Sequence, residues 1–153
     1  MSTVDTATRK VWWTVAACDR NGQPVYTTAP LEAADAASRW YSYWDDKPFV
    51  DRVELTEHAI DRTDRAITYD DLPGPGRATA PPELPEGAHA AERVFRFDRG
   101  PAVLPTGDCV RRHHAWLIAT QRDRIDLSTL RLFEVTLIRY ARRIELHDLG
   151  ASA

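Results

Sequence analysis

The chain has 153 residues, of which 43% are hydrophobic, and it carries a formal net charge of −3. This size is sufficient to bury a full core, and it predicts one domain or two very small ones. No run of residues approaches the roughly 18 consecutive apolar positions of a membrane-spanning helix, and only Cys18 and Cys109 are available for a disulfide. We therefore expect a soluble, cytoplasmic protein. Arginine far outnumbers lysine and alanine is abundant, which indicates a GC-rich bacterial or phage genome.

The first recognisable element is a β-hairpin over residues 11–27. Alternation at a period of two predicts a strand with one set of residues on each face; the two sets are Val11, Trp13, Val15 and Ala17, and Trp12, Thr14, Ala16 and Cys18. The dipeptide Asn21-Gly22 tolerates the positive φ that a short hairpin loop requires. Residues 25–27 then return as a second strand.

A helix and a third strand follow the hairpin. Thr27 or Thr28 is a suitable N-cap, Pro30 fits the first turn, and small and aromatic residues recur at helical spacing as far as Trp44. Asp45, Asp46 and Pro48 predict the end of this helix. Residues 49–57 again alternate as in a strand. The sequence therefore predicts a strand-strand-helix-strand unit over residues 9–69.

The middle of the chain is rich in proline and glycine. Residues 70–89 hold five of the ten prolines and three of the seven glycines, a composition that propagates neither a helix nor a central strand. We expect a loop or linker here. It is interpreted as a disordered connector or, alternatively, as a proline-rich binding segment, although Pro82-x-x-Pro85 is a very common pattern.

The second half, residues 90–150, predicts a mixed α/β sub-unit. Residues 93–98 read as a strand, and a helix capped by Thr106 or Asp108 is expected from about Cys109 to Gln121. The segment 130–147 fits a helix face and a strand face almost equally well, and its length favours a helix. Two shorter strands are the alternative.

These elements together predict one α+β domain over residues 1–153. It contains an N-terminal strand-strand-helix-strand unit (9–69) and a mixed second sub-unit (90–150), joined by the linker 70–89. The sheet is expected to be covered by helices.

One cluster has the residue types for catalysis or metal binding. Cys109 and His113 are four residues apart, so on a helix they share a face and can reach one Zn²⁺ ion, with His114 beside them. His58, His89 or His147 are further candidate ligands. The same pair can be read as a Cys-His nucleophile. Because structural zinc needs four ligands in paired short spacings and only one pair exists, a buried thiol beside a hydrogen-bonded histidine is the competing interpretation. We assign no cofactor.

Other reaction signatures are missing from the sequence. There is no glycine-rich nucleotide loop, no GxSxG elbow and no HExxH motif. Acidic pairs such as Asp45-Asp46 and Asp70-Asp71 are explained by capping and solvation. These observations favour a protein that is not an enzyme.

The charge distribution suggests nucleic acid as an alternative partner. Residues 93–147 contain 11 arginines against 6 acidic residues, and arginine binds phosphate in a bidentate fork. The candidate contacts are Arg111, Arg112, Arg139, Arg142 and Arg143. However, the whole-chain pI of 5.9 is low for a dedicated nucleic-acid binder, and the competing interpretation is that these arginines are solvated or paired.

The tryptophans favour a protein partner. Trp12 and Trp13 point to opposite faces of their strand, so only one can lie in a single core. The other is either exposed or covered by a second layer that the second half of the chain supplies. Exposed tryptophan is enriched at interfaces, which makes Trp12, Trp40 and Trp44 the candidate contacts. The sequence thus predicts a small non-catalytic interaction protein or homo-oligomer, with an immunity, inhibitor, chaperone or assembly role.

Overall fold

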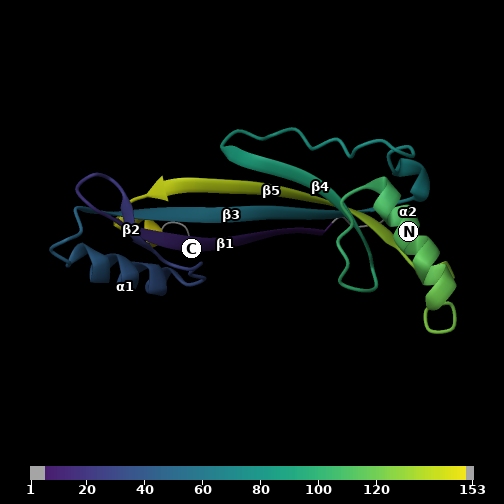
Figure 1. Ribbon diagram of the computed structural model, residues 1–153, viewed down its shortest axis with the longest axis horizontal. Coiled ribbons are helices and arrows are strands. Elements are labelled where there is room, and N and C mark those ends of the chain that lie inside the picture. The colour runs from purple at the N-terminus through teal and green to yellow at the C-terminus, as the bar shows by residue number, and fades with distance from the viewer. Residues whose placement is uncertain (1–5, 151–153) are drawn as a thin grey trace. The chain divides into compact units, whose positions relative to one another are not determined.

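The computed structural model describes residues 6–150, so the ends of the expected 1–153 domain lie outside the described residues. It combines two α-helices with one five-stranded antiparallel sheet (Figure 1). The expected α+β class is therefore confirmed at the level of mixed helices and sheet. Neither helix within the described range is long and apolar enough to cross a membrane.

Seven principal elements make up the fold. In chain order they are β1 (Thr6–Cys18), β2 (Pro24–Thr27), α1 (Ala34–Asp45), β3 (Arg52–Ile67), β4 (Ala88–Phe97), α2 (Gly107–Thr120) and β5 (Leu132–Ile144). Three short 3₁₀ turns lie at Tyr69–Asp71, Leu127–Thr129 and Leu146–Gly150. The strand order in the sheet is β2-β1-β3-β5-β4, which makes β2 and β4 the edge strands.

The described residues form two compact units. The α1 unit contains residues 9–60, 87–89 and 139–150, and the α2 unit contains residues 6–8, 61–86 and 90–138. This division passes through strands, whereas the sequence-based sub-units 9–69 and 90–150 meet at the loop 70–89. The expected strand-strand-helix-strand unit is matched only in part, because the α1 unit also takes the last residues of β5 into its sheet. Assignment of the whole chain to one domain stays a prediction.

The β1–β2 hairpin of the α1 unit follows from its turn residues. The Asp19 carboxylate accepts hydrogen bonds from the backbone N–H groups of Asn21 (2.9 Å) and Gln23 (3.0 Å). Gly22 has a φ of +78°, which side-chain-bearing residues rarely adopt. The strands then pair antiparallel, with Ala17 opposite Tyr26.

Helix α1 begins five or six residues later than its sequence pattern predicts, with Ala33 as its N-cap. Thr28 is buried and does not cap the helix; its hydroxyl accepts a 3.0 Å hydrogen bond from the Val15 N–H. Leu31 pairs with Trp13 in an isolated antiparallel bridge, so the chain stays extended up to Ala33. The expected cap at Thr27 or Thr28 was therefore wrong, because pairing with β1 overrides local helix preference. The predicted helix end near Asp45 is confirmed.

Each unit has its own core. In the α1 unit, Ala37 of α1 belongs to a buried cluster that also contains strand residues and one residue near the C-terminal end: Trp13, Val15, Leu55, Ile144 and Leu149. The small side chain of Ala37 lets the helix approach the sheet closely. In the α2 unit, the core consists of Leu72, Phe95, Phe97, Leu104, Val110, Leu117 and Leu132.

Helix α2 has the N-cap that the sequence predicts. The Thr106 hydroxyl accepts a 3.1 Å hydrogen bond from the Cys109 N–H, satisfying one of the helix's unpaired donors. Val110 and Leu117, two turns apart, are buried on the same face.

The proline-rich segment between β3 and β4 packs on its own unit over its first part. Leu72 is a core residue, the Pro73 carbonyl accepts a 2.6 Å hydrogen bond from Arg111, and the Gly76 N–H donates to Asp108. The Ala80 carbonyl accepts from Arg93. This part of 70–89 is therefore an anchored loop, and the expectation of a disordered connector does not describe it.

Segment 130–147 forms a strand, so the expected helix was wrong. Residues 132–144 are the single strand β5, without the break near residues 139–142 that the alternative required. The β-branched residues Val135, Thr136 and Ile138 suit a pleated surface. Because β5 lies between β3 and β4, strand pairing on both sides decides the ambiguity in its periodicity.

Candidate protein-interaction surface

Five aromatic side chains of the α1 unit form one contiguous surface, called here the aromatic surface: Tyr26, Trp40, Tyr43, Trp44 and Phe49. Tyr26 comes from β2, three rings come from α1, and Phe49 follows the helix. The Tyr26 ring stacks on Trp44 with centroids 4.8 Å apart, and Tyr43 meets Trp44 edge-on at 5.1 Å. Helical spacing places Trp40 and Trp44 side by side.

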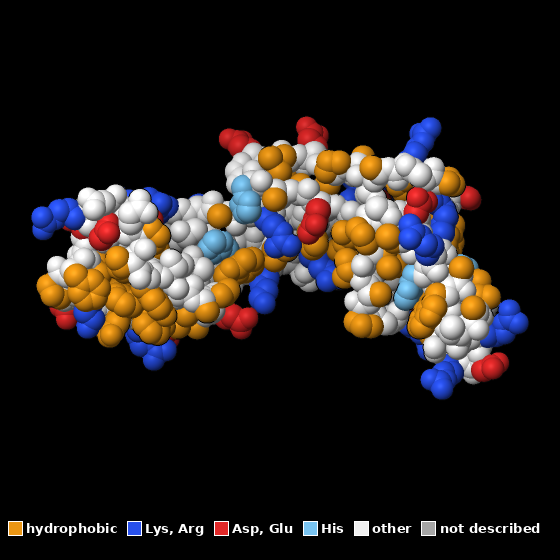
Figure 2. Space-filling view, in the orientation of Figure 1, with side chains coloured by type: hydrophobic (Ala, Val, Ile, Leu, Met, Phe, Trp, Pro, Cys, Tyr) orange, Lys and Arg blue, Asp and Glu red, His pale blue; other side chains and the backbone are white. Residues whose placement is uncertain are grey.

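Most of the aromatic surface is accessible to solvent. The exposed fraction is 59% for Phe49, 49% for Tyr43, 40% for Tyr26 and 36% for Trp40. In Figure 2, hydrophobic side chains gather as an orange patch over α1. Large aromatic residues contribute most when buried, so contiguous exposure of four of them is typical of a binding surface.

The aromatic surface has a depression and nearby positive charge. Ala36, Arg39, Trp40 and Tyr43 line a depression of about 440 Å³. The Lys47 ammonium lies 4.1 Å from the centroid of the Tyr43 ring, a cation–π contact. At the covered base of the surface, the Trp44 indole N–H has no hydrogen-bond partner among the described residues.

The adjacent tryptophans of β1 have different surroundings. Trp13 is buried in the core under α1, whereas Trp12 is half-buried on the opposite face and stacks on His58 at 5.5 Å. His58 is joined to Thr14 by a 2.9 Å hydrogen bond. Burial, and then the nearby His89, lower the pKa of His58. Trp12 and Arg139 line a separate depression of about 270 Å³. Trp12 is thus not part of the aromatic surface.

Cys109 and His113 both lie on α2. Cys109 is half-buried near the start of α2, and His113 stacks between Phe97 (5.8 Å) and Trp116 (5.6 Å). His114 lies against Tyr69. Over residues 6–150, no group of three or more His, Cys, Asp or Glu side chains is placed to hold a metal ion. The alternative of a metal- or thiol-dependent site at Cys109 and His113 stays a prediction.

The candidate nucleic-acid arginines are divided between the two units. In the α2 unit, Arg111 pairs with Asp108 at 3.2 Å, and Arg112 is exposed. In the α1 unit, Arg142 pairs with Glu57 at 3.0 Å and Arg143 with Glu54 at 3.1 Å. Much of the positive charge is therefore compensated locally, as the alternative interpretation of these residues proposed.

Sequence reasoning identified part of the aromatic surface. It named Trp40 and Trp44 but missed Tyr26, Tyr43 and Phe49. Tyr43 could have been found, since it is three residues from Trp40 on a helix. Tyr26 and Phe49 belong to other segments and reach α1 only through the hairpin and the turn after the helix.

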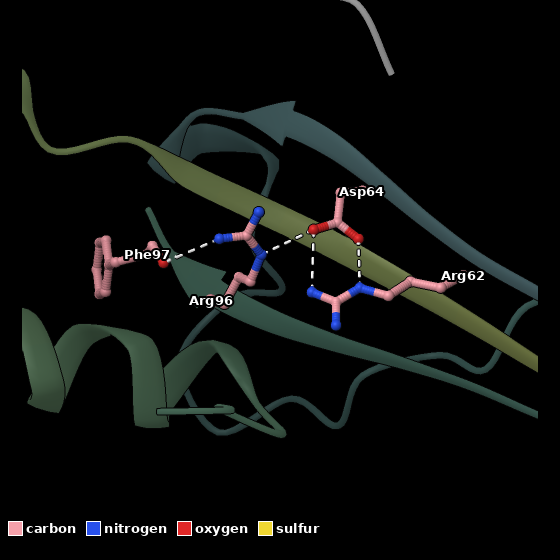
Figure 3. Close-up of polar contacts among 4 residues, drawn as sticks. All are labelled: Arg62, Asp64, Arg96 and Phe97. Carbon is pink, nitrogen blue, oxygen red and sulfur yellow. Dashed lines mark hydrogen bonds and ion pairs between the residues drawn. The ribbon is translucent and has the colours of Figure 1, made fainter. Parts of the chain in front are cut away.

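A buried carboxylate of the α2 unit was also missed. Asp64 is 7% exposed and accepts hydrogen bonds from Arg62 (2.7 and 3.1 Å) and Arg96 (2.7 Å), as Figure 3 shows. The hydrogen bonds from Arg62, and then from Arg96, outweigh burial and lower the pKa of Asp64. Arg96 also donates to the Phe97 carbonyl and lies over the Phe133 ring. With both oxygens engaged, this group is structural.

Comparisons with protein-family models, with curated proteins and with solved structures found no match for this chain.

Proposed function

We propose that this protein is a non-catalytic interaction module that binds a protein partner through the aromatic surface. The observation that carries the proposal is the contiguous packing of five aromatic rings, by stacked and edge-on contacts, with four of the rings substantially exposed. A bacterial or phage accessory role, such as immunity, inhibition, chaperoning or assembly, is the setting we propose for it.

The chemistry of the surface indicates what its partner presents. The depression between Trp40 and Tyr43 suits an aliphatic or aromatic anchor side chain, because such pockets are where binding energy concentrates. Arg39 at the depression and Lys47 over Tyr43 favour an acidic residue beside that anchor. The expected partner segment is thus apolar with a flanking carboxylate.

The proposal is tested by affinity capture with single variants. The protein, Trp40→Ser and Phe49→Ser are immobilised separately, and the proteins retained from a lysate of the source organism are quantified by mass spectrometry. We expect one partner to be retained by the native protein and reduced about tenfold or more by either variant, since interface anchors contribute about 2 kcal/mol or more.

The matched control is Trp116→Ser. Trp116 is 51% exposed and stacks on a neighbouring ring, but it belongs to the α2 unit. This variant should retain the partner at the native level. Equal loss in all three variants, or a retained set that none of them changes, would contradict binding through the aromatic surface.

A further inference from the structure

A second depression of the α1 unit lies outside the aromatic surface. It has a volume of about 410 Å³ and is lined by Arg9, Glu57, Ala59, Gly87, Tyr140, Ala141 and Arg142. On β3, Glu57 and Ala59 follow the core residue Leu55 at steps of two, so they share its face. Beyond the part of this face that α1 covers, charged side chains therefore replace the apolar core.

Arg142 is oriented for a further interaction. Its Nε donates a 3.0 Å hydrogen bond to Glu57 Oε1, and its side chain is 65% exposed. The structure gives its two terminal amino groups no hydrogen-bond partner among residues 6–150. A guanidinium held through Nε presents its remaining N–H donors in the planar geometry that carboxylates and phosphates accept.

Arg9 adds a second positive charge to the same depression. Its guanidinium carbon lies 5.4 Å from the centroid of the Tyr140 ring, and both residues line the depression. The ring supports the guanidinium by a cation–π contact. The lining of the depression thus contains a second guanidinium beside that of Arg142.

Glu57 supplies an acceptor at the same place. Its side chain is only 12% exposed, and Oε2 is covered and has no hydrogen-bond partner among the described residues. A buried carboxylate oxygen without a donor is costly, and a donor brought by a ligand relieves that cost.

We infer that this depression, called here the anion pocket, binds a small organic anion that also carries a hydrogen-bond donor. The anionic group, a carboxylate or a phosphate, pairs with Arg142, and an amine or hydroxyl of the same molecule donates to Glu57. The volume lies within the range of small-molecule sites, about 300–1,000 Å³.

The test is an NMR titration of the ¹⁵N-labelled full chain with four probes. L-serine and glycerol 3-phosphate each combine an anion with donors, while acetate and methyl phosphate supply the corresponding anion with no such donor group. We expect saturable shifts of the Gly87 and Arg142 amides with a donor-bearing probe, which binds about tenfold tighter than its simple counterpart. The pair that responds identifies carboxylate or phosphate as the source.

Two variants and a matched control complete the test. Arg142→Gln should weaken binding about tenfold or more, and Glu57→Gln should remove the preference for the donor-bearing probe. Arg143→Gln is the control, because it alters the neighbouring arginine of β5, equally exposed at 66% and paired with Glu54 instead. It should bind as the native protein does. Thermal unfolding confirms that each variant is folded.

The inference is overturned by any of three results. These are no saturable shift with any probe at tens of millimolar, equal weakening by Arg143→Gln, or an unchanged donor preference in Glu57→Gln. None of them bears on the aromatic surface.

Discussion

Strand β3 carries two largely covered carboxylates whose surroundings differ. Asp64, in the α2 unit, accepts three hydrogen bonds from two arginines that use both of its oxygens. Glu57, in the α1 unit, accepts one from Arg142 through Oε1, and its Oε2 has no partner among the described residues. A buried acid with complete pairing is thus a structural group, whereas one with an unused acceptor is a candidate for binding.

The largest expected effect comes from Asp64→Asn. The amide oxygen can replace Oδ2, which accepts from both Arg62 and Arg96, but the NH₂ group then faces the Arg62 Nε–H donor and the negative charge is lost. We expect the free energy of unfolding to fall by about 2–3 kcal/mol, below the full cost of breaking a buried pair because Arg62 is 46% exposed and can be solvated. Urea denaturation, monitored by circular dichroism, measures this loss in the free energy of unfolding. A loss under about 0.5 kcal/mol would remove the distinction between the two carboxylates.

The pH dependence of stability tests whether Asp64 is held in its charged form by its two arginines. Hydrogen bonds from Arg62, and then from Arg96, hold the pKa of folded Asp64 below its ordinary value of 3.8. Its contribution is therefore complete above the unfolded-state pKa and is lost as the pH falls through the folded-state pKa.

We expect the stability difference between the native protein and Asp64→Asn to be constant above about pH 5 and to narrow below about pH 4. Denaturation curves collected across this range measure the difference. A difference that stays constant down to the acid limit of folding would show that Asp64 titrates with no shift.

The two arginines around Asp64 should contribute unequally. Arg96 is 30% exposed, donates to both Asp64 and the Phe97 carbonyl, and lies 4.6 Å from the Phe133 ring centroid. We expect Arg96→Gln to cost about 1–1.5 kcal/mol and Arg62→Gln somewhat less, because more exposed pairs are weaker. A double-mutant cycle with Asp64→Asn isolates each coupling energy. A larger cost for Arg62→Gln than for Arg96→Gln would show that the two hydrogen bonds of Arg62 to Asp64 contribute more than the greater burial of Arg96.

The smallest expected effect comes from Glu57→Gln. Glu57 has one ion pair, to an arginine that is 65% exposed, and such pairs contribute at most about 1 kcal/mol. We expect a change in the free energy of unfolding within about 1 kcal/mol, measured by the same denaturation. A cost equal to that of Asp64→Asn would show that Glu57 is a structural group like Asp64, and it would contradict the proposed difference between the two carboxylates.

Local sequence signals were sufficient to predict an element where residues close in the chain satisfy each other's hydrogen-bonding groups. The Asn21-Gly22 turn is stabilised by Asp19 two to four residues away, and Thr106 caps a helix three residues on. Such contacts depend on short-range geometry alone.

Signals that depend on distant partners were misread or missed. Segment 132–144 has two possible periodicities, and only its place between β3 and β4 makes it a strand. Thr28 has the chemistry of a helix cap, yet its hydroxyl accepts from Val15 in another strand. In both cases long-range backbone pairing outweighs a local preference of a few tenths to about 1 kcal/mol.

Local patterns in the sequence were enough for the α+β class and the hairpin turn, for two candidate caps of α2, and for naming Trp40 and Trp44 as candidate contacts. Only the tertiary structure decided that Tyr26 and Phe49 join those rings, that Asp64 is enclosed by Arg62 and Arg96, and that Glu57 meets Arg142 across 85 residues. The physical reason is that surfaces and buried ion pairs are assembled from strands remote in the chain. Their register is set by pairing across the whole sheet, which no local pattern records.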